Sequence, residues 1–462
     1  MDSPGPRIAS WEPDVRLTNT PAASTTIYNF GRTVAASAGR LHAVWRETAT
    51  TAEVDYARSL DGGTTWLPAV RLSSTPVTLP PIIAAAGDTV IATWSAYDEA
   101  TQFTVRVRRS LDGGETWQPE QTLTTTGRSA LAPLQIVGER VYLVWAETED
   151  PAGPEIYFRR SLDLGATWEA PVKISNSYNS PSWVPTISAV GDLVLVGWVD
   201  YADANEEEYL RRSTDGGITW GPITRLTADA ADSWAPSIAI ANDDVYLTWF
   251  DRRDAGVSDV DVENALDAAL IMVGLAPQPS PPRDPSDYYL PLFEQRIKAK
   301  QQALAGAAPT WVQNGGDQQQ LEALVQQFMT KYQAWVTGWE LYIKRSTDGG
   351  GTWSPDARLT TASGMSARPS IVAIGDEVHV VWFDARDGSL ADPSGYGGFT
   401  EIYYKASTDR GLTWSDDTRL TNATGDSSMA GLATDGDQLH VVWTDERDGN
   451  AEVYYKRATL GP

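Results

Sequence analysis

Short apolar strands alternate with turns along most of the chain, and one pattern recurs about every fifty residues. The segments that mark this repeat end in a tryptophan, at Trp45, Trp94, Trp145, Trp198, Trp249, Trp382 and Trp443. Each repeat contains an apolar strand, a turn, a second strand that ends in the tryptophan, a third strand and a short fourth strand of the Arg-Leu-Thr type. Four strands in a repeat of this length are typical of a propeller blade. The pattern therefore predicts an all-β, seven-bladed β-propeller.

Six repeats carry the same hairpin between the third and fourth strands. These hairpins span Ser59–Trp66, Ser110–Trp117, Ser161–Trp168, Ser213–Trp220, Ser346–Trp353 and Ser407–Trp414. An aspartate can accept backbone N–H bonds inside such a turn, and glycine tolerates a positive φ. The hairpin resembles the Asp-box of the sialidase-like, BNR-repeat propellers. This resemblance implies that the hairpins are structural and lie on the face opposite the ligand site.

The seventh repeat lacks both the hairpin and a fourth strand. The missing strand is present at the other end of the chain, where Trp11–Thr18 matches Trp353–Thr360 almost position for position. We therefore expect the N-terminal strand to complete the last blade, which would leave no large open sheet edge.

One insertion interrupts the repeat between the second and third strands of blade 5. Residues 255–338 break the strand pattern, so 1–254 would hold blades 1–5 and 339–462 the rest of blade 5 with blades 6 and 7. The insertion carries three apolar stripes at helical spacing: Val262, Leu266, Ala269, Leu270 and Val273; Leu290, Phe293, Ile297 and Leu304, after a possible N-cap at Ser286; and Leu321, Leu324, Val325, Phe328, Tyr332, Trp335, Val336 and Trp339. The helices would pack together on the blade, or else form a lid over the pore or a surface for a partner or oligomer.

Charge and composition exclude several classes of function. With 36 basic and 61 acidic side chains, the formal charge of −25 disfavours nucleic acid as a partner. Zero cysteines and three histidines, His42, His379 and His440, disfavour zinc and thiol chemistry, and we expect no cofactor and no metal. A weak likeness to a calcium loop at Asp259, Asp261 and Glu263 leaves metal binding open.

No membrane span is expected, because the longest apolar helical stretch is short and carries Asp267. The first residues also lack the pattern of a secretory signal peptide in this numbering. We nevertheless expect an extracellular or cell-surface location.

An Asp-x-Arg-Asp pattern follows the second strand in three neighbouring blades. It places Arg253, Arg386 and Arg447 on the face that carries the loops between second and third strands. An arginine held by an aspartate can bind a carboxylate through two hydrogen bonds, so these residues are candidate ligand-binding groups. A feature repeated in each blade can equally be an ion pair within its own loop.

The resemblance to sialidases implies three arginines for a substrate carboxylate, a tyrosine nucleophile and an acidic residue. The candidates are Arg32, Arg128 and Arg368 for the carboxylate and Tyr396 for the nucleophile. Glycoside hydrolysis needs two carboxylates across a cleft, for which Glu147, Asp200, Asp251 and Asp384 are available. Tyr178, Trp183 and Trp234 precede inner strands, where they would stack on a sugar or pack between blades.

These patterns favour a recognition module over an enzyme, because the scaffold motifs match the pattern of the sialidase-like propellers closely and the catalytic motifs match it poorly. We expect a secreted or surface-displayed protein that binds a carbohydrate or a protein partner through the loop face, with the helical insertion shaping that face. One alternative is a sialidase-like exo-glycoside hydrolase. A second alternative is a structural or assembly subunit, in which the apolar stripes of the insertion would be exposed until a complex forms.

Overall fold

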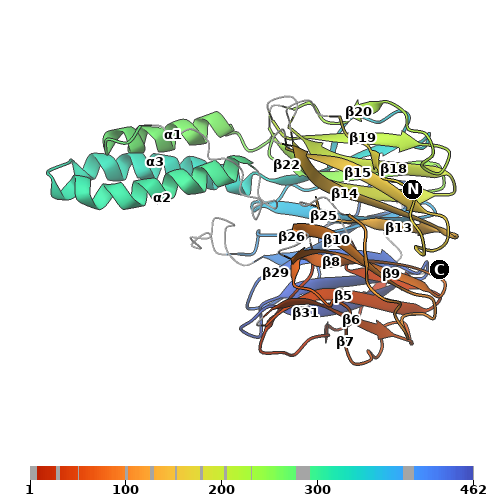
Figure 1. Cartoon of the computed structure of the whole chain (residues 1–462). Helices are drawn as coiled ribbons and strands as arrows, with labels where there is room; N and C mark the ends of the chain where they lie inside the picture. Colours follow the sequence, from red (N-terminus) through yellow and green to blue (C-terminus); the bar gives the residue numbers. More distant parts are fainter. Residues whose placement is uncertain are drawn as a thin grey trace.

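Seven antiparallel sheets form a ring, and three helices leave the ring as a single arm (Figure 1). The computed structural model describes residues 8–27, 32–49, 51–98, 102–124, 129–150, 153–176, 181–201, 205–229, 231–276, 292–388 and 400–460. Within these ranges the seven-bladed β-propeller predicted from the repeats is confirmed.

Each blade runs from an inner strand at the axis to a short outer strand. Blade 1 contains β3 (Ala23–Thr25), β4 (Val34–Ser37), β5 (Arg40–Thr48), β6 (Ala52–Ser59) and β7 (Val70–Arg71). Blade 2 contains β8 (Val77–Ala86), β9 (Thr89–Asp98), β10 (Gln102–Ser110) and β11 (Gln121–Thr122). Blade 3 contains β12 (Ser129–Ala130), β13 (Leu134–Val137), β14 (Arg140–Asp150), β15 (Gly153–Ser161) and β16 (Val172–Lys173). Blade 4 contains β17 (Ser182–Val190), β18 (Leu193–Asp200), β19 (Glu207–Ser213) and β20 (Ile223–Arg225).

The remaining blades hold the insertion and the closure of the ring. Blade 5 contains β21 (Ser233–Ala241), β22 (Asp244–Asp251), β23 (Glu340–Ser346) and β24 (Ala357–Arg358). Blade 6 contains β25 (Ser366–Ile374), β26 (Glu377–Asp384), β27 (Glu401–Ser407) and β28 (Thr418–Arg419). Blade 7 contains β29 (Ser427–Thr434), β30 (Gln438–Asp445) and β31 (Glu452–Leu460), joined by β1 (Ile8–Trp11) and β2 (Val15–Arg16).

The N-terminal strand completes blade 7, as the sequence match predicts. In β2, Val15 lies opposite Tyr455 and Arg16 opposite Tyr454 of β31. Side chains strengthen this junction, because Arg16 Nη2 donates to Glu452 Oε1 at 2.9 Å. The two ends of the chain are thus joined in one sheet, and blade 7 has no open outer edge at β31.

The hairpin between the third and fourth strands is held together by hydrogen bonds of its serine and its aspartate. In blade 1, Ser59 Oγ donates to Asp61 Oδ1 and accepts the Gly63 N–H, both at 2.8 Å. The Thr65 N–H donates to Asp61 at 2.8 Å, and this bond leads the interactions that lower the pKa of Asp61 to about 2. Gly63 has φ +89°, and a Cβ there would lie 2.0 Å from the Tyr455 hydroxyl of blade 7. The hairpin therefore ties each blade to its neighbour on the face opposite the loop face.

A second repeated contact joins the third and fourth strands of a blade. In blade 5, Glu340 accepts hydrogen bonds from Thr360 Oγ1 at 2.5 Å and Arg358 Nη2 at 2.6 Å. The Thr360 hydroxyl also accepts the Leu341 N–H at 2.9 Å. The buried glutamate is thereby hydrogen-bonded and paired with a cation, which gives the arginine and threonine of the fourth-strand Arg-Leu-Thr sequence a structural role.

Replacing Thr360 with valine removes both hydrogen bonds of the hydroxyl and leaves the buried Glu340 short of a donor. We expect this variant to lose about 1–3 kcal/mol of unfolding free energy, measured by chemical denaturation. Thr360→Ser keeps the hydroxyl and is the control. A valine variant as stable as the serine variant would contradict the role given to this contact.

The inner strands of blades 4 to 7 share a bulge near the axis. Val184, Ala235, Arg368 and Met429 adopt φ values between 49° and 59°. The register between first and second strands shifts at each of these places, for example between Ala367 and Ser370. Such a left-handed conformation is costly for residues other than glycine, so the surrounding sheet must hold it in place. The bulge is followed in three blades by Thr186, Ser237 or Ser370, which line the central channel.

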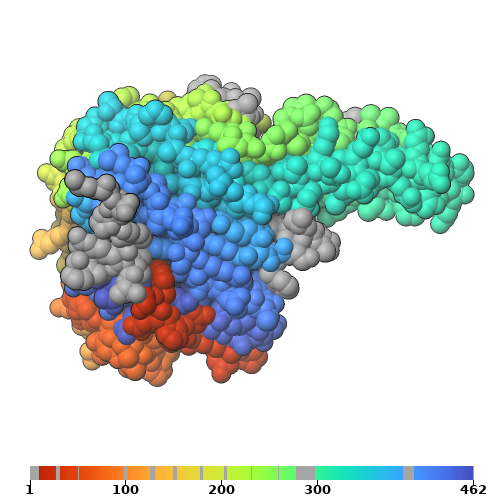
Figure 2. Space-filling model, turned by 180° about the vertical axis from the view of Figure 1, so that it is seen from behind, coloured from red at the N-terminus to blue at the C-terminus, as the bar shows by residue number. Residues whose placement is uncertain are grey.

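The insertion forms a three-helix arm between β22 and β23. It consists of α1 (Asp259–Met272), α2 (Leu292–Gln313) and α3 (Gln318–Thr337). The arm projects away from the ring and does not fold back over it, as Figures 1 and 2 show from opposite sides. None of the helices in the described ranges has the length and apolar character needed to cross a bilayer.

The apolar stripes of the insertion are buried inside the arm. Leu266, Ile297, Phe328 and Trp335 are 0–2% exposed, and the large apolar side chains that the described part of the arm exposes are scattered at Val260, Ile271 and Met329. In the described part of the arm the three helices cover one another, so these stripe residues are buried within the arm and are not exposed. Ser286 and Leu290 lie outside the described residues.

Acidic side chains at the start of the arm make hydrogen bonds within the arm. Asp261 forms a capping box with Ser258, whose hydroxyl donates to its carboxylate at 2.6 Å. Glu263 and Asp267 each accept a hydrogen bond at 2.7 Å from the buried Lys300 of α2. Among the described residues no group of three or more acidic or histidine side chains is arranged to hold a metal ion.

Candidate functional site

The Asp-x-Arg-Asp loops form ion-pair networks within their own blades. In blade 6, Arg386 makes hydrogen bonds of 2.8 and 2.7 Å to Asp384 and one of 2.8 Å to Asp417. Its guanidinium also lies 4.4 Å from the ring centre of Tyr403, whose hydroxyl donates to Asp387. The same arrangement recurs at Arg253 with Asp251 and Asp356, and at Arg447 with Asp445 and Asp14. The geometry favours the internal ion pair over the ligand-binding interpretation.

Electrostatics support this assignment. Burial lowers the pKa of Arg386, but the hydrogen bonds and charges of Asp384 and Asp417 outweigh it and leave the pKa raised. A guanidinium that already holds two carboxylates has little capacity left for a ligand carboxylate. Arg253 differs from its two counterparts because it also lines a pocket, described below.

The four carboxylates that we considered for glycoside hydrolysis are all hydrogen-bonded to buried tryptophans of the same strand. Each accepts the indole N–H of the tryptophan two positions earlier: Glu147 from Trp145, Asp200 from Trp198, Asp251 from Trp249 and Asp384 from Trp382. In blades 4 to 7 a serine of the inner strand adds a second hydrogen bond, such as Ser366 to Asp384 at 2.7 Å. These four carboxylates are at most 5% exposed, which leaves them without access to a substrate.

The aromatic candidates pack inside the ring. Trp183 and Trp234 are 5% and 0% exposed, so neither presents a ring face to a sugar. Trp234 packs edge-on against Phe250, and the guanidinium of Arg368 lies 5.5 Å from its ring centre. Arg368 is itself 5% exposed, which places it among the packed aromatics. Tyr178, Arg128 and Tyr396 lie outside the described residues.

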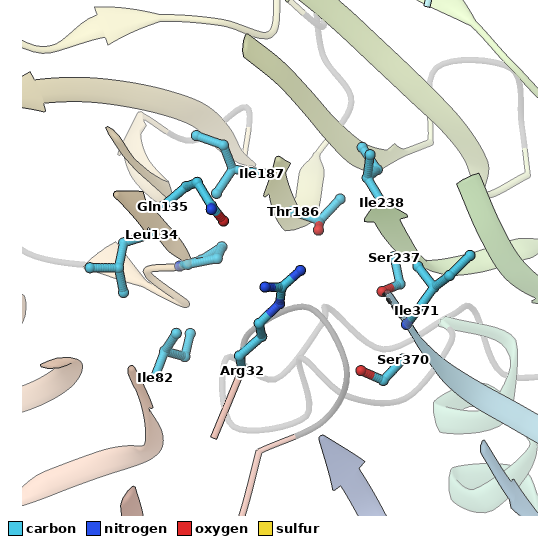
Figure 3. Close-up of a pocket in the computed structure, with 11 residues that line it drawn as sticks. Arg32, Ile82, Leu134, Gln135, Thr186, Ile187, Ser237, Ile238, Ser370 and Ile371 are labelled. Carbon is cyan, nitrogen blue, oxygen red and sulfur yellow. Dashed lines mark hydrogen bonds between the residues drawn. The ribbon is translucent and has the colours of Figure 1, made fainter. Parts of the chain in front are cut away.

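Arg32 projects into the central channel, where residues of blades 1 to 6 line one cavity (Figure 3). The walls of this cavity combine apolar and polar side chains. The apolar residues are Ile82, Pro133, Leu134, Ile187, Ile238 and Ile371, and the polar ones are Gln135, Thr186, Ser237 and Ser370. The cavity around the guanidinium measures about 20 Å³. That volume suits a species of the size of water and is too small for a sugar ring.

A larger pocket lies where the arm leaves the loop face. It measures about 330 Å³ and is lined by Asp229, Ala231, Arg252, Arg253, Gly256, Val257, Ser258 and Asp261. We call it the arm-base pocket. Three segments build it: the loop that enters β21, the loop from β22 into the arm, and the first turn of α1. Its volume lies within the usual range of small-molecule sites.

The floor of this pocket is rigid. Arg252 has a side chain only 1% exposed and donates to Asp232 at 2.9 Å. Its guanidinium packs against two tryptophans that contact each other edge-to-face, 4.2 Å from the ring centre of Trp335 in α3 and 4.5 Å from that of Trp339, which directly precedes β23. A cation packed against aromatic rings and paired with a carboxylate is well fixed. Arg252 therefore fastens the arm to blade 5.

The comparisons with known proteins point to the fold more strongly than to one activity. No protein-family model matches the chain. A stretch of 146 residues is 29% identical to the xyloglucanase Xgh74A of Acetivibrio thermocellus and covers 25% of this chain. The chain spans only 16% of the length of that relative.

Two solved structures share the fold across nearly the whole chain. One is described as an ulvan lyase from a new family of polysaccharide lyases, with a TM-score of 0.56, 8% identity and coverage of 97% of this chain and 96% of that one. The other is the polysaccharide lyase Uly1, with a TM-score of 0.54, 10% identity and coverage of 97% and 99%. At these identities the similarity shows the fold alone.

Sequence reasoning did not identify the arm-base pocket. Asp229 and Ser258 carry no motif, and Asp261 suggested only a weak likeness to a calcium loop. One feature of the sequence did point to this place. The insertion begins just after Arg252 and Arg253, in a loop between a second and a third strand, so it had to start on the loop face. The pocket itself depends on how the arm is placed against the loop before β21, which local patterns do not determine.

Proposed function

We propose that this protein recognises a neutral carbohydrate in the arm-base pocket on its loop face. The observation that carries the proposal is the composition of the pocket wall. Two carboxylate residues, Asp229 and Asp261, line a cavity of about 330 Å³ together with Arg253 and Ser258, and the buried Arg252 lies at its floor.

This mixture of groups suits hydroxyl-rich ligands. A carboxylate only accepts hydrogen bonds and a guanidinium only donates them, while each sugar hydroxyl does both. The charges of Arg252 and Arg253 are already paired with Asp232, Asp251 and Asp356, and the wall adds Asp229 and Asp261, so an anionic ligand is disfavoured. The net charge of −25 further disfavours a polyanionic chain. Names of related proteins, a xyloglucanase and two polysaccharide lyases, support a carbohydrate ligand.

Among the wall residues Asp229 has the most capacity for a ligand. Its Oδ1 accepts the Ala231 N–H at 3.2 Å, and its Oδ2 lies 3.8 Å from Arg253 Nε. The side chain of Asp229 is 35% exposed. The Asp261 side chain is 53% exposed, but its carboxylate is held by the Ser258 hydroxyl at 2.6 Å and the Ser258 N–H at 3.1 Å. Asp229 is therefore the wall carboxylate that we assign to ligand hydroxyls.

Recognition without turnover is the activity that we favour. The carboxylates nearest the expected catalytic places are buried against tryptophan, and Asp251 is 0% exposed. Burial raises the pKa of Asp251 despite its contacts with Arg253. A binding protein needs only the pocket, whereas a hydrolase also needs two carboxyl groups free to act on the scissile bond, and Asp261 is engaged by Ser258 in the helix cap. An extracellular or cell-surface location agrees with such a ligand and belongs to this proposal.

A glycan array followed by calorimetry on the best ligand tests the proposal. We expect wild-type protein to bind neutral oligosaccharides, and Asp229→Ala to raise Kd about 10–100-fold through loss of a charged hydrogen bond. Ala231→Trp should abolish binding by filling the cavity while all charges remain. Asp437→Ala, an exposed aspartate of the opposite face, should bind like wild type.

Two outcomes would overturn the proposal. An array without any bound glycan would remove the carbohydrate ligand, and unchanged affinity in both pocket variants would remove the pocket. The same ligands should be incubated with the protein and analysed for products. Release of shorter sugars would replace recognition by hydrolysis or elimination.

A further inference from the structure

Arg32 is a cation in the middle of the ring, held there by its backbone. Its carbonyl accepts the Ile83 N–H of blade 2 at 2.8 Å, so the residue sits at the junction of two inner strands. From this position the guanidinium points toward Thr186, with Gln135 and Ser237 on either side (Figure 3). The side chain thus reaches across the axis toward the blades opposite.

No acidic side chain accompanies this cation in the described part of the chain. None of the residues that line its cavity is acidic, and no hydrogen bond or ion pair of the guanidinium occurs within the described ranges. Arg252, Arg253, Arg386 and Arg447 each contact at least one carboxylate. Desolvation by the channel walls lowers the pKa of Arg32. Arg32 is half-buried in the channel, and a partly desolvated charge without a counter-charge is unfavourable, so a counter-ion from solution would stabilise the fold.

The hydroxyl groups of the channel are arranged to donate to such an ion. Ser237 Oγ accepts the Ile371 N–H at 3.4 Å, and Ser370 Oγ accepts the Leu432 N–H at 3.2 Å. With their oxygens engaged by backbone N–H groups, both hydroxyls keep their protons for another acceptor. Thr186 and Gln135 add further donors to the same cavity.

We propose that the central channel binds one small inorganic anion of the halide class, such as chloride, between Arg32 and the hydroxyls of Thr186, Ser237 and Ser370. The cavity of about 20 Å³ limits the ion to a single small species. The ligands come from blades 1, 4, 5 and 6, so the ion ties inner strands from different parts of the ring. This site lies apart from the arm-base pocket and does not depend on the proposed function.

Thermal unfolding in chloride and in gluconate at equal ionic strength tests the site. Because a ligand that binds only the folded state stabilises it, wild-type Tm should rise with chloride concentration and saturate, by about 2 °C or more. Arg32→Met removes the charge at similar volume, and its Tm should not respond to chloride. Arg140→Met changes a surface arginine that pairs with Asp192 at 2.6 Å, and should respond like wild type.

Crystals grown in bromide provide a measurement that does not depend on stability. The proposal predicts an anomalous peak beside the Arg32 guanidinium in wild type and none in Arg32→Met. A wild-type channel without an anomalous peak, or equal chloride dependence of wild type and Arg32→Met, would overturn it. Should Arg32→Met fail to fold, the bromide peak in wild type alone decides the question.

Discussion

Replacing Arg252 with alanine is expected to lower the unfolding free energy by about 3–5 kcal/mol. The Arg252 side chain is 1% exposed and its partner Asp232 is 8% exposed. Truncation leaves the Asp232 carboxylate buried without its cation, which is the costly half of a broken ion pair. It also removes the cation–π contacts of the guanidinium with Trp335 and Trp339.

A double substitution separates the buried charge from general damage to the fold. In Arg252→Met with Asp232→Asn, neither partner carries a charge, so this variant should be more stable than Arg252→Ala alone. Chemical denaturation gives the stability, and hydrogen exchange at the base of α3 reports whether the arm loosens. A loss below 1 kcal/mol for Arg252→Ala would contradict the role of Arg252 as the fastening of the arm.

Replacing Glu208 with leucine is expected to raise the unfolding free energy at neutral pH by about 1–4 kcal/mol. Glu208 is 0% exposed, and both of its carboxylate oxygens are buried without a hydrogen-bond partner among the residues that the structure describes. The equivalent position of the third strand is apolar in each of the other six blades: Val54, Val105, Ile156, Leu341, Ile402 and Val453. These six residues are also 0% exposed, so leucine restores the side-chain type that the site accommodates.

The same substitution should change how stability depends on pH. Burial, followed by the charges of Glu207, Glu206 and Asp251, raises the pKa of Glu208 well above its ordinary value of 4.5. When folding raises the pKa of a carboxyl group, its titration does not reduce the unfolding free energy at pH values below its ordinary pKa. The unfolding free energy then falls as pH rises from the ordinary pKa toward the raised pKa. Wild type should therefore lose stability as pH rises above about 4.5, and Glu208→Leu should lose less.

The neighbouring Glu207 provides the matched control. Its carboxylate accepts hydrogen bonds from Thr227 and from Arg225, the latter at 2.8 Å. Glu207→Leu should therefore destabilise the protein, although the two glutamates are adjacent and equally buried. Equal effects of the two substitutions, or a destabilised Glu208→Leu, would show that Glu208 is satisfied in the folded protein.

The ring and its closure could be predicted because they depend on local patterns. Strand alternation, the serine–aspartate hairpin and the match of Trp11–Thr18 to Trp353–Thr360 each involve neighbouring residues. The helical stripes of the insertion also placed α1 and α3 correctly. In each case the pattern reflects which face of one element is buried, and the sequence records that directly.

The function of the polar residues was harder to predict because it depends on contacts between distant segments. Arg253 could face a ligand or its own blade, and the deciding partner Asp356 lies about a hundred residues away, beyond the arm. Trp234 stands where a sugar would stack, yet the inner-strand bulge holds it in the core at 0% exposure. The width of the channel around Arg32 likewise results from several blades meeting.

One available signal was overlooked. Glu208 stands out when the seven third strands are aligned, since it is the acidic residue in an otherwise apolar column. The comparison requires only the repeat itself. Departures from a repeat within one chain are therefore as informative as the repeat, because the other blades define what the position normally holds.

A crystal structure with the oligosaccharide selected on the array is the most direct test of the central claim. The account predicts sugar density in the arm-base pocket, with hydroxyl groups within hydrogen-bonding distance of Asp229 and Arg253. Density bound elsewhere on the loop face, with this pocket unchanged, would contradict the assignment of the pocket as the recognition site.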